Sequence, residues 1–296
     1  MSIACSIGIM AYNEEANIGR TLDAVVSQRT ARVSLTEIVV VASGCTDRTE
    51  SIVQDWARRD PRIHLVVQPR REGKASATNS FLTQAREKIV VLCGADLLPE
   101  ADALEGLVAP FADPAVGMTT GRPVPVNDPG TFMGFAAHLL WDLHHQVNLR
   151  SFKAGELIAF RKIFAQIPFY TSVDEASIEP VIRGQGYEVR YVPMAVVYNK
   201  GPLTVADFLR QRRRIFAGHL AVRKTLGYTV STMSGWRILR VLMHHLDWRP
   251  RPFLWTWSVA ALEVYGRLLG RRDYKKRPRR PVWEIAKTTK DLKART

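Results

Sequence analysis

Short apolar runs, rich in β-branched residues, alternate with longer mixed segments through the first hundred residues of the chain. Runs of this kind are typical of strands buried on both faces of a sheet. The sequence predicts four such strands, at Ile3–Met10, Glu37–Ala42, Arg62–Gln68 and Lys88–Cys93. The segments between them predict helices that end near Gln28, Arg59 and Arg86. This alternation indicates βαβ units, an α/β fold and a mostly parallel sheet.

The pattern loosens after residue 110. Val116–Thr120 predicts one more strand, and Arg122–Gly130, which contains three prolines, predicts an extended loop. Beyond this loop, the spacing of apolar residues predicts helices over Thr131–Leu149, Val173–Gly184 and Val205–Gly227. Further strands are expected between Lys153 and Phe160 and over Glu188–Val197.

The last 70 residues have a different character. Trp236–Leu246 and Phe253–Leu269 predict two amphipathic helices, separated by a break at Arg251 and Pro252. The longest uncharged stretch of the second of these segments, Pro252–Leu262, has 11 residues, whereas a helix that spans a bilayer needs roughly 20. Aromatic side chains beside the basic cluster Arg271–Arg280 favour attachment to an anionic membrane surface. The alternative is two ordinary helices packed on the rest of the chain.

Charge is distributed unevenly along the chain. Of the 296 residues, 46% are hydrophobic and 24% are charged, which is the composition of a globular protein. Residues 201–296 contain 22 Lys and Arg against 6 Asp and Glu, a net charge of +16, and the total of +14 therefore leaves −2 for residues 1–200. A basic half attracts nucleic acid, anionic lipid or phosphorylated ligands, and the alternative is a solvated surface without a dedicated partner.

The cysteines and the N-terminus bear on the compartment. Cys5, Cys45 and Cys93 stand far apart and form no Cys-x-x-Cys pair. This spacing argues against a disulfide scaffold or a zinc module and fits a reducing compartment. The first ten residues lack the basic start of a signal peptide. With the basic C-terminal helices, these features predict a cytoplasmic protein attached peripherally at the cytoplasmic face of a membrane.

Asp96 is the first candidate for chemistry. It follows the apolar run Ile89–Cys93, where the predicted strand ends, and the small residues Gly94 and Ala95 leave room for a ligand. A carboxylate at the carboxyl end of a parallel strand faces the crevice where open α/β sheets bind ligands. The alternative is that Asp96 caps a helix that starts near Pro99.

Six segments stand in one order along the chain: AYNEEANI, EIVVVASGCTD, GKASATN, GAD, VDEA and QRRRI. In this order they resemble the inverting family-2 glycosyltransferases with a GT-A fold, over residues 3–220. The resemblance implies a GT-A (Rossmann-like) catalytic domain at residues 1–227, followed by a basic amphipathic helical region at 228–296. It also implies sugar transfer from a nucleotide-sugar donor to a hydroxyl acceptor, with Mg²⁺ or Mn²⁺ as cofactor. The C-terminal helices suggest a lipid or lipid-linked acceptor.

The resemblance assigns the start of the nucleoside pocket to consecutive residues after the first strand: Ala11, Tyr12, Asn13 and Glu14. Ser43 follows the second strand, where the family commonly has an aspartate pair that contacts the base. This chain has Ala42 and Ser43 there, so the base is not predicted. Asn13 and Asp47 also fit as helix caps.

Further donor contacts are implied along the chain. The resemblance places Lys74 and Asn79 near the donor, and a lysine at a helix N-terminus can meet a phosphate. The alternative is a solvated lysine. Gln211 and Arg214 resemble the Gln-x-x-Arg-Trp motif of processive polysaccharide synthases, in which the arginine could clamp the diphosphate. Ile215 replaces the tryptophan of that motif, which argues against a processive synthase.

The resemblance also implies a metal site. The family usually has Asp-x-Asp, whereas here Gly94 takes the first position, so that Asp96 is the one direct carboxylate ligand and Ala95 lies beside the donor. Diphosphate oxygens and water would complete the shell of Mg²⁺ or Mn²⁺. His219 matches a late histidine that often completes such sites, and the alternative is a histidine satisfied within its helix.

An acidic pair begins one of the predicted helices. Family-2 enzymes often have Glu-Asp at this place, with the second residue as general base. The position implies Glu175 as the base, although the reversed order leaves Asp174 open. Acids in a first helical turn also complement the helix dipole. Lys153, Gly155 and Glu156 resemble a family loop near the acceptor.

Two other classes of protein remain as alternatives. One is a membrane- or nucleic-acid-binding protein that keeps a degenerate nucleotide-binding fold, as the substitutions at Ala42 and Gly94 would allow. The basic half contains no recognisable nucleic-acid-binding module, so nucleic acid is not the expected partner. The other is a nucleotidyltransferase, which should have a glycine-rich basic loop where this chain has AYNEEANI.

Overall fold

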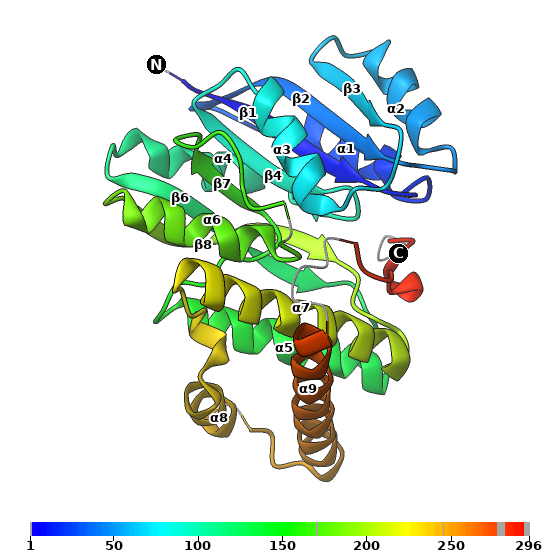
Figure 1. The fold of residues 1–296 in the computed structure, drawn as a ribbon, viewed down its shortest axis with the longest axis vertical. Helices are drawn as coiled ribbons and strands as arrows, with labels where there is room; N and C mark the ends of the chain where they lie inside the picture. The colour runs from blue at the N-terminus through cyan, green and yellow to red at the C-terminus, as the bar shows by residue number, and fades with distance from the viewer. Residues whose placement is uncertain (1, 170, 245, 277–281, 293–296) are drawn as a thin grey trace.

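The computed structural model describes residues 2–169, 171–244, 246–276 and 282–292. The strands are β1 (Ile3–Ala11), β2 (Val33–Ser43), β3 (Ile63–Gln68), β4 (Ile89–Gly94), β5 (Leu98–Pro99), β6 (Val116–Pro125), β7 (Ile158–Arg161) and β8 (Glu188–Asn199). The α-helices are α1 (Ile18–Val26), α2 (Thr49–Ala57), α3 (Lys74–Gln84), α4 (Ala103–Val108), α5 (Phe132–Asn148), α6 (Asp174–Gly184), α7 (Val205–Leu226), α8 (Gly235–His244) and α9 (Pro250–Lys276). The strands form one sheet in the order β3-β2-β1-β4-β7-β6-β8-β5 (Figure 1).

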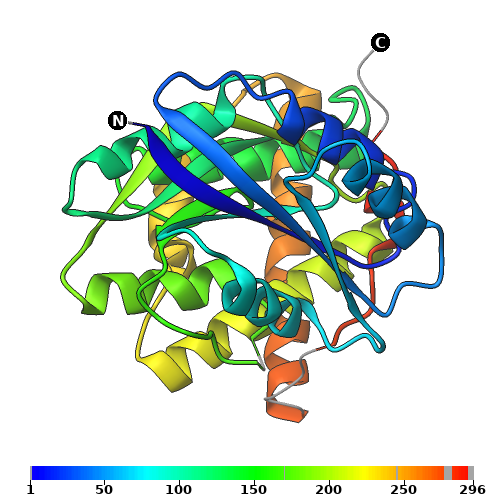
Figure 2. The ribbon, with the colours of Figure 1, turned by 90° about the horizontal axis from the view of Figure 1, so that it is seen from above.

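The first four strands form a parallel half-sheet, as the sequence predicts. β1 lies between β2 and β4 and pairs in parallel with both, and β3 pairs in parallel with β2. Helices α1, α2 and α4 cover one face, and α3 and α6 cover the other (Figure 2). Strands covered on both faces need apolar residues at every position, which explains the continuous apolar runs.

The second half of the sheet is mixed. β7 runs antiparallel between β4 and β6, and β5 runs antiparallel to β8, while β6 and β8 pair in parallel. Strand and helix no longer alternate regularly here, so the pattern that predicts parallel pairing in the first half is absent. The chain nevertheless has strands and helices in both halves, as the predicted α/β fold class requires.

Strand β6 is longer than the sequence predicts. The loop expected over Arg122–Gly130 is wrong for its first part, because β6 continues to Pro125 and pairs with β8 as far as Asn199. β7 pairs with β6 only as far as Thr120. Proline is tolerated in a strand that has a paired neighbour on one side only, so proline content misleads here.

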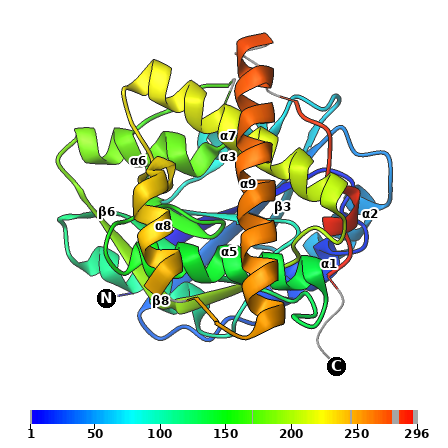
Figure 3. The same ribbon diagram turned by 90° about the horizontal axis from the view of Figure 1, so that it is seen from below.

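Helices α5, α7, α8 and α9 lie together on one side of the molecule (Figure 3). α9 runs against α7, and a Cβ atom added at Gly270 would lie 2.7 Å from the backbone oxygen of Arg213. The expected break at Arg251 and Pro252 is wrong, because α9 already begins at Pro250. Prolines in the first turn of a helix interrupt no intrahelical hydrogen bond.

The basic C-terminal cluster is described in part. α9 includes it as far as Lys276, and residues 277–280 of the expected cluster lie outside the described residues. Apolar side chains of α5 pack against both α8 and α9. Within the described parts of the chain, no helix combines the length and the apolar character that crossing a bilayer requires.

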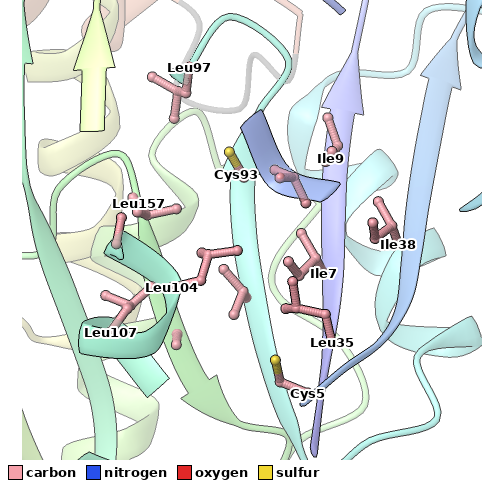
Figure 4. Close-up of a cluster of buried hydrophobic side chains, with 14 of the residues drawn as sticks. Cys5, Ile7, Ile9, Leu35, Ile38, Cys93, Leu97, Leu104, Leu107 and Leu157 are labelled. Carbon is pink, nitrogen blue, oxygen red and sulfur yellow. The ribbon is translucent and has the colours of Figure 1, made fainter. Parts of the chain in front are cut away.

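The main core fixes the edge of the sheet that carries the site. Ile7 and Ile9 of β1 face Leu104 and Leu107 of α4 in one cluster, and all four are fully buried (Figure 4). Burying a side chain of this size contributes about 1.5–3 kcal/mol. The carboxyl ends of β1 and β4, which emerge from this cluster, are therefore held rigidly with respect to each other.

Candidate active site

Two adjoining pockets open near the carboxyl ends of β1 and β4. One, which we call the β1–β4 pocket, has a volume of about 260 Å³ and is lined by Tyr12 and Asp96 among others. The other, the α5–α7 pocket, has a volume of about 210 Å³, and α5 and α7 contribute 6 and 7 of its lining residues. Both are lined by Lys74, Glu156, Ser172, Asn199, Lys200, Gln211 and Arg214. The pockets therefore meet at the edge where open α/β sheets bind ligands.

Four carboxylates line the β1–β4 pocket: Glu14, Asp96, Glu156 and Glu284. Burial and then the charge of Asp96 raise the pKa of Glu14 to about 7, against the effects of Lys290 and Asn17. Burial and the charge of Asp96 also raise the pKa of Glu156 to about 7. Asp96 is thus close enough to Glu14 and Glu156 to repel them. Mg²⁺ and Mn²⁺ prefer such oxygen ligands, so these residues fit a divalent cation.

His219, the other predicted metal ligand, has different surroundings. It is buried and lines the α5–α7 pocket, whereas Asp96 lines only the β1–β4 pocket. Burial, followed by the charges of Lys153, Arg212 and Arg267, holds the pKa of His219 well below its usual range. These three positively charged side chains would repel a metal ion at His219. Across the described residues, no group of three or more His, Cys, Asp or Glu is arranged to hold a metal without help from a ligand.

Lys74, the first residue of α3, lies where the two pockets meet. Its Nζ atom is 3.6 Å from Oδ2 of Asp174. Burial lowers the pKa of Lys74, but the carboxylates of Asp174 and Glu175 outweigh this effect and raise it. Lys74 is therefore a firmly charged cation beside both pockets, at the helix N-terminus that the sequence indicates.

The two acids that begin α6 have different environments. Asp174 is 1% exposed and lines neither pocket, and its Oδ2 accepts a hydrogen bond from Thr78 at 3.1 Å. Glu175 is half-buried and lines the α5–α7 pocket. Burial raises the pKa of Glu175, and Lys74 opposes the shift. Among the described residues, no side-chain hydrogen bond engages the Glu175 carboxylate, which leaves it able to accept a proton from a bound ligand.

Most residues predicted to bind the nucleotide sugar line the β1–β4 pocket: Ala11, Tyr12, Glu14, Ser43, Lys74, Gln211 and Arg214. The guanidinium of Arg71 lies over the ring of Tyr12, with its Cζ 4.3 Å from the ring centroid. Gln211 and Arg214 also line the α5–α7 pocket. These residues come from four separate parts of the chain, and the fold brings them together.

Three predicted donor residues line neither pocket, namely Asn13, Asn79 and Ala95. Asn13 has a φ of 50°, and its amide exchanges hydrogen bonds of 2.8 and 3.0 Å with Thr46. Asn79 holds the backbone of Ile167 through two hydrogen bonds of 2.8 and 2.9 Å. Ala95 is buried. Asn13 and Asn79 therefore hold neighbouring loops in place through these hydrogen bonds.

Asn13 and Asp47 both fit as helix caps in the sequence, and the structure shows the position of each relative to its helix. Asp47 accepts a hydrogen bond of 3.0 Å from the backbone nitrogen of Thr49, where α2 begins. The N-cap position of α2 is Arg48, so Asp47 lies one residue before the cap and binds the first amide of the helix from there. α1 begins only at Ile18, so Asn13 does not cap it.

The α5–α7 pocket combines apolar surface with buried cations. Helix α5 contributes Met133, Ala137, Leu140, Trp141, Leu143 and His144. Lys153, Arg212 and Arg267 also line it, and Glu263 pairs with Arg212 at 3.8 Å and with Arg267 at 2.8 Å. Burial and the charge of Arg212 lower the pKa of Lys153 to about 8. The pocket thus suits a ligand with an apolar part and an anionic part.

Several pocket residues were not predicted from the sequence. Arg71 could have been found, because it stands three residues before Lys74 in a basic loop. Lys200 stands three residues after the predicted strand Glu188–Val197, which the structure extends to Asn199 as β8. By contrast, Lys290 and its neighbours stand near the end of the chain, and no local pattern indicates that they return to the β1–β4 pocket.

Two family models match the chain. That of glycosyl transferase family 2 matches residues 6–179, more than half of the chain, and that of glycosyl transferase family group 2 matches residues 181–269. The chain belongs to glycosyltransferase family 2. The resemblance read from the sequence motifs is thereby confirmed. Family membership favours a glycosyltransferase over the nucleotidyltransferase and the non-enzymatic alternatives.

Curated family-2 relatives resemble parts of the chain. A dolichyl-phosphate beta-glucosyltransferase of Trichomonas vaginalis is 32% identical over 111 residues, which are 36% of this chain and 34% of that protein. A poly-beta-1,6-N-acetyl-D-glucosamine synthase of Staphylococcus aureus is 24% identical over 238 residues, which are 76% of this chain and 57% of that protein. The chain therefore spans less than two thirds of the length of these relatives.

Solved structures support the GT-A fold. A mannosyltransferase of Pyrobaculum calidifontis, in complex with GDP-Man and Mn²⁺, is 24% identical, with a TM-score of 0.62 over 93% of this chain and 79% of that one. A glucosyl-3-phosphoglycerate synthase of Mycobacterium tuberculosis, with Mn²⁺, UDP and phosphoglyceric acid, is 19% identical, with a TM-score of 0.55 over 77% of this chain and 80% of that one. The predicted fold class is confirmed.

Proposed function

We propose that this family-2 glycosyltransferase transfers a sugar from a nucleoside-diphosphate donor in the β1–β4 pocket to a hydroxyl group in the α5–α7 pocket, with inversion. One observation carries the proposal. Asp96 lines the first pocket, Glu175 lines the second, and the two pockets share the residues between them. Donor and acceptor would therefore meet beside Lys74 and Arg214.

The β1–β4 pocket would hold the donor. Asp96, with Glu14 and Glu156 nearby, provides the carboxylates for Mg²⁺ or Mn²⁺, and two solved relatives contain Mn²⁺ with GDP-Man or UDP. When bound there, such a cation supplies positive charge that stabilises the departing diphosphate. Lys74 and Arg214 lie at the junction of the pockets, where they add charge-assisted hydrogen bonds to the phosphates.

The acceptor hydroxyl would be activated by Glu175. Its ionised carboxylate accepts the hydroxyl proton while the oxygen attacks the anomeric carbon from the face opposite the diphosphate, which inverts the configuration. Burial raises the pKa of this carboxyl, and Lys74 limits the rise. Asp174 acts as a positioning residue that holds Lys74 at the junction.

The acceptor class follows from the chemistry of the α5–α7 pocket. Lys153, Arg212 and Arg267 favour an anionic group, and the apolar side chains of α5 favour a hydrocarbon part. The names of two relatives are consistent with this reading, since one acts on dolichyl phosphate and the other was solved with phosphoglyceric acid. We infer an amphipathic anionic acceptor, including one carried on a lipid.

Attachment to a membrane surface would bring such an acceptor within reach. Trp236, Trp248 and Leu254 are 69%, 73% and 64% exposed. Trp236 belongs to α8, Trp248 to the connection between α8 and α9, and Leu254 to the start of α9, and these elements lie at the same end of the molecule (Figure 1). Basic residues such as Arg251 accompany them. Exposed aromatic and basic side chains are suited to an anionic bilayer surface. We place the enzyme peripherally at the cytoplasmic face.

The test is release of nucleoside diphosphate from UDP-, GDP- and dTDP-sugars, measured with Mn²⁺, Mg²⁺ or EDTA. We expect slow hydrolysis of one donor that requires the metal and that an acceptor accelerates. Release of pyrophosphate would instead identify a nucleotidyltransferase. If no nucleotide with metal shifts the thermal unfolding of the protein, the β1–β4 pocket is not a donor site and the proposal fails.

A further inference from the structure

The chain returns to the β1–β4 pocket after α9. Residues 282–292, which we call the C-terminal strap, lie beside the rest of the pocket (Figure 1, red). The strap residues that line the pocket are Val282, Trp283, Glu284, Ile285, Ala286, Thr289 and Lys290. Both family models end before this segment, at residue 269 or earlier. The strap is therefore a wall of the pocket that the family match does not cover.

Hydrogen bonds fasten the strap on two sides of the pocket. Thr288 donates to Oδ2 of Asp207, in the first turn of α7, from its backbone nitrogen at 2.9 Å and from its hydroxyl at 2.7 Å. The backbone nitrogen of Leu292 donates to Oδ1 of Asn17, just before α1, at 2.7 Å. The side chain of Leu292 is fully buried. Lys290 is thus held between two anchors.

Lys290 reaches the carboxylates of the pocket. Its Nζ atom donates to the backbone oxygen of Tyr12 at 2.9 Å and pairs with the carboxylate of Glu14. The side chain of Lys290 is 26% exposed, and that of Glu14 is 7% exposed. Asp96 repels Glu14 electrostatically, and Lys290 opposes that repulsion. The ammonium group therefore neutralises part of an acidic cluster that would otherwise attract another cation.

We propose, building on the donor site of the proposed function, that Lys290 is a tethered cation that competes for the carboxylate of Glu14 with a divalent metal ion bound at Glu14 and Asp96. With Lys290 in place, the strap closes one side of the pocket. When a divalent cation takes these carboxylates, the ammonium group leaves and the strap opens. The pocket then has two states, one held by the strap and the other held by the metal ion.

The competition follows from simple electrostatics. The ammonium group of Lys290 at Glu14 and a divalent cation at Glu14 and Asp96 repel each other, so each weakens the binding of the other. Besides the anchors at Asp207 and Asn17, the strap accepts hydrogen bonds of 2.8, 2.8 and 3.0 Å from Arg71, Lys200 and Leu203. Each bond of this kind contributes a net value of about 0.5–1.5 kcal/mol, or about 1.5–3 kcal/mol where a charged group takes part. A cation bound tightly to one state can outweigh anchors of this size, because a ligand shifts the equilibrium by its differential affinity.

The first experiment measures binding of Mn²⁺ alone by isothermal titration calorimetry. We expect Lys290→Met to bind Mn²⁺ about tenfold more tightly than the wild-type chain, as for a pocket that is open about one tenth of the time. Lys290→Arg retains the charge and should bind as the wild type does. Lys224→Met, at an exposed lysine near the end of α7, is the matched control and should change nothing.

The second experiment measures hydrogen exchange of the strap peptide in the wild-type chain. The amide of Leu292 and that of Thr288 should lose protection when Mn²⁺ is added with UDP, because their hydrogen bonds open. Equal Mn²⁺ affinity in Lys290→Met and the wild type, or protection that persists with Mn²⁺ and UDP, would overturn the proposal. Neither measurement needs an acceptor or turnover. A failure here with metal-dependent donor hydrolysis intact therefore refutes the strap and leaves the proposed function standing.

Discussion

Replacement of Glu175 tests the proposed chemistry most directly. Glu175→Gln keeps the size and polarity of the side chain but removes its ability to accept a proton. Loss of a general base typically lowers kcat by about 10²–10⁴-fold, which corresponds to about 3–5 kcal/mol of transition-state stabilisation. The KM for the donor should change little, because Glu175 lines the α5–α7 pocket and not the β1–β4 pocket.

Asp174→Asn is the control for Glu175→Gln, because it removes the charge of the neighbouring acid. The pair of Lys74 and Asp174, at 3.6 Å, has an interaction energy of about 1 kcal/mol in bulk water and about 5 kcal/mol at an effective dielectric constant of about 20. The side chain of Lys74 is 45% exposed, so solvent screening favours the smaller figure. About 1 kcal/mol is a factor of about five. We therefore expect a donor KM about fivefold higher and a much smaller loss of kcat than in Glu175→Gln.

The assay is the initial rate of nucleoside diphosphate release as a function of pH. The base must be ionised, so kcat/KM should fall as the pH drops through the pKa of Glu175. Burial raises that pKa, and the acid limb should therefore lie above the ordinary range of a glutamate. Glu175→Gln should lose the limb, and Asp174→Asn should keep it. Thermal unfolding of both variants checks that they are folded.

The reverse pattern would refute this assignment. If Asp174→Asn loses at least as much kcat as Glu175→Gln, the buried acid performs the chemistry and the pocket-lining acid does not. If Glu175→Gln and Asp174→Asn both retain the acid limb and the wild-type rate, neither acid of α6 is the base. A phosphate oxygen of the acceptor could then attack without a base.

Three further predictions address the metal site, the core and the membrane surface. Asp96→Asn should weaken Mn²⁺ binding by about tenfold or more, because a divalent site loses a charged ligand; unchanged affinity in calorimetry would remove Asp96 from the site. Gly8→Ala should lower the free energy of unfolding by about 1–3 kcal/mol in urea denaturation, since the new methyl group would overlap the buried ring of Phe81; an unchanged midpoint would show that the ring moves aside. Trp248→Ala should reduce sedimentation with phosphatidylglycerol vesicles and leave donor binding intact, because Trp248 is 73% exposed; equal sedimentation would exclude this end of the molecule from the membrane contact.

The parallel half of the sheet could be predicted because its physical cause is local. A strand covered on both faces needs an apolar run, and β1, β2 and β4 each contain one, whereas the run of the edge strand β3 is interrupted by His64. Asp96 could be placed for the same reason, since it directly follows the run that becomes β4. The second half lacks this signal. The continuation of β6 to Pro125 depends on which side of the strand is paired, and that is decided by β7 and β8.

The roles of the acidic pair could not be separated from the sequence. Consecutive residues of a helix point about 100° apart, because a turn contains about 3.6 residues. That single step puts Asp174 into the core beside Thr78 and puts Glu175 at the pocket. The packing of α6 against α3, α7 and the sheet decides which residue faces which way, and a motif in the sequence contains no information about it.

The excess positive charge of residues 201–296 lies in two places in the folded protein, at the surface and in the pockets. The basic half was interpreted as a surface for an anionic partner, and α8 and α9 retain that role in our proposal. Yet Arg212, Arg214, Arg267 and Lys290 of the same half line the two pockets. There they lie near acids of the nearly neutral half, such as Glu14, which Lys290 contacts. Part of the excess positive charge is therefore directed inward, where a donor diphosphate and an anionic acceptor would need it, and composition alone cannot divide these cations from those at the surface.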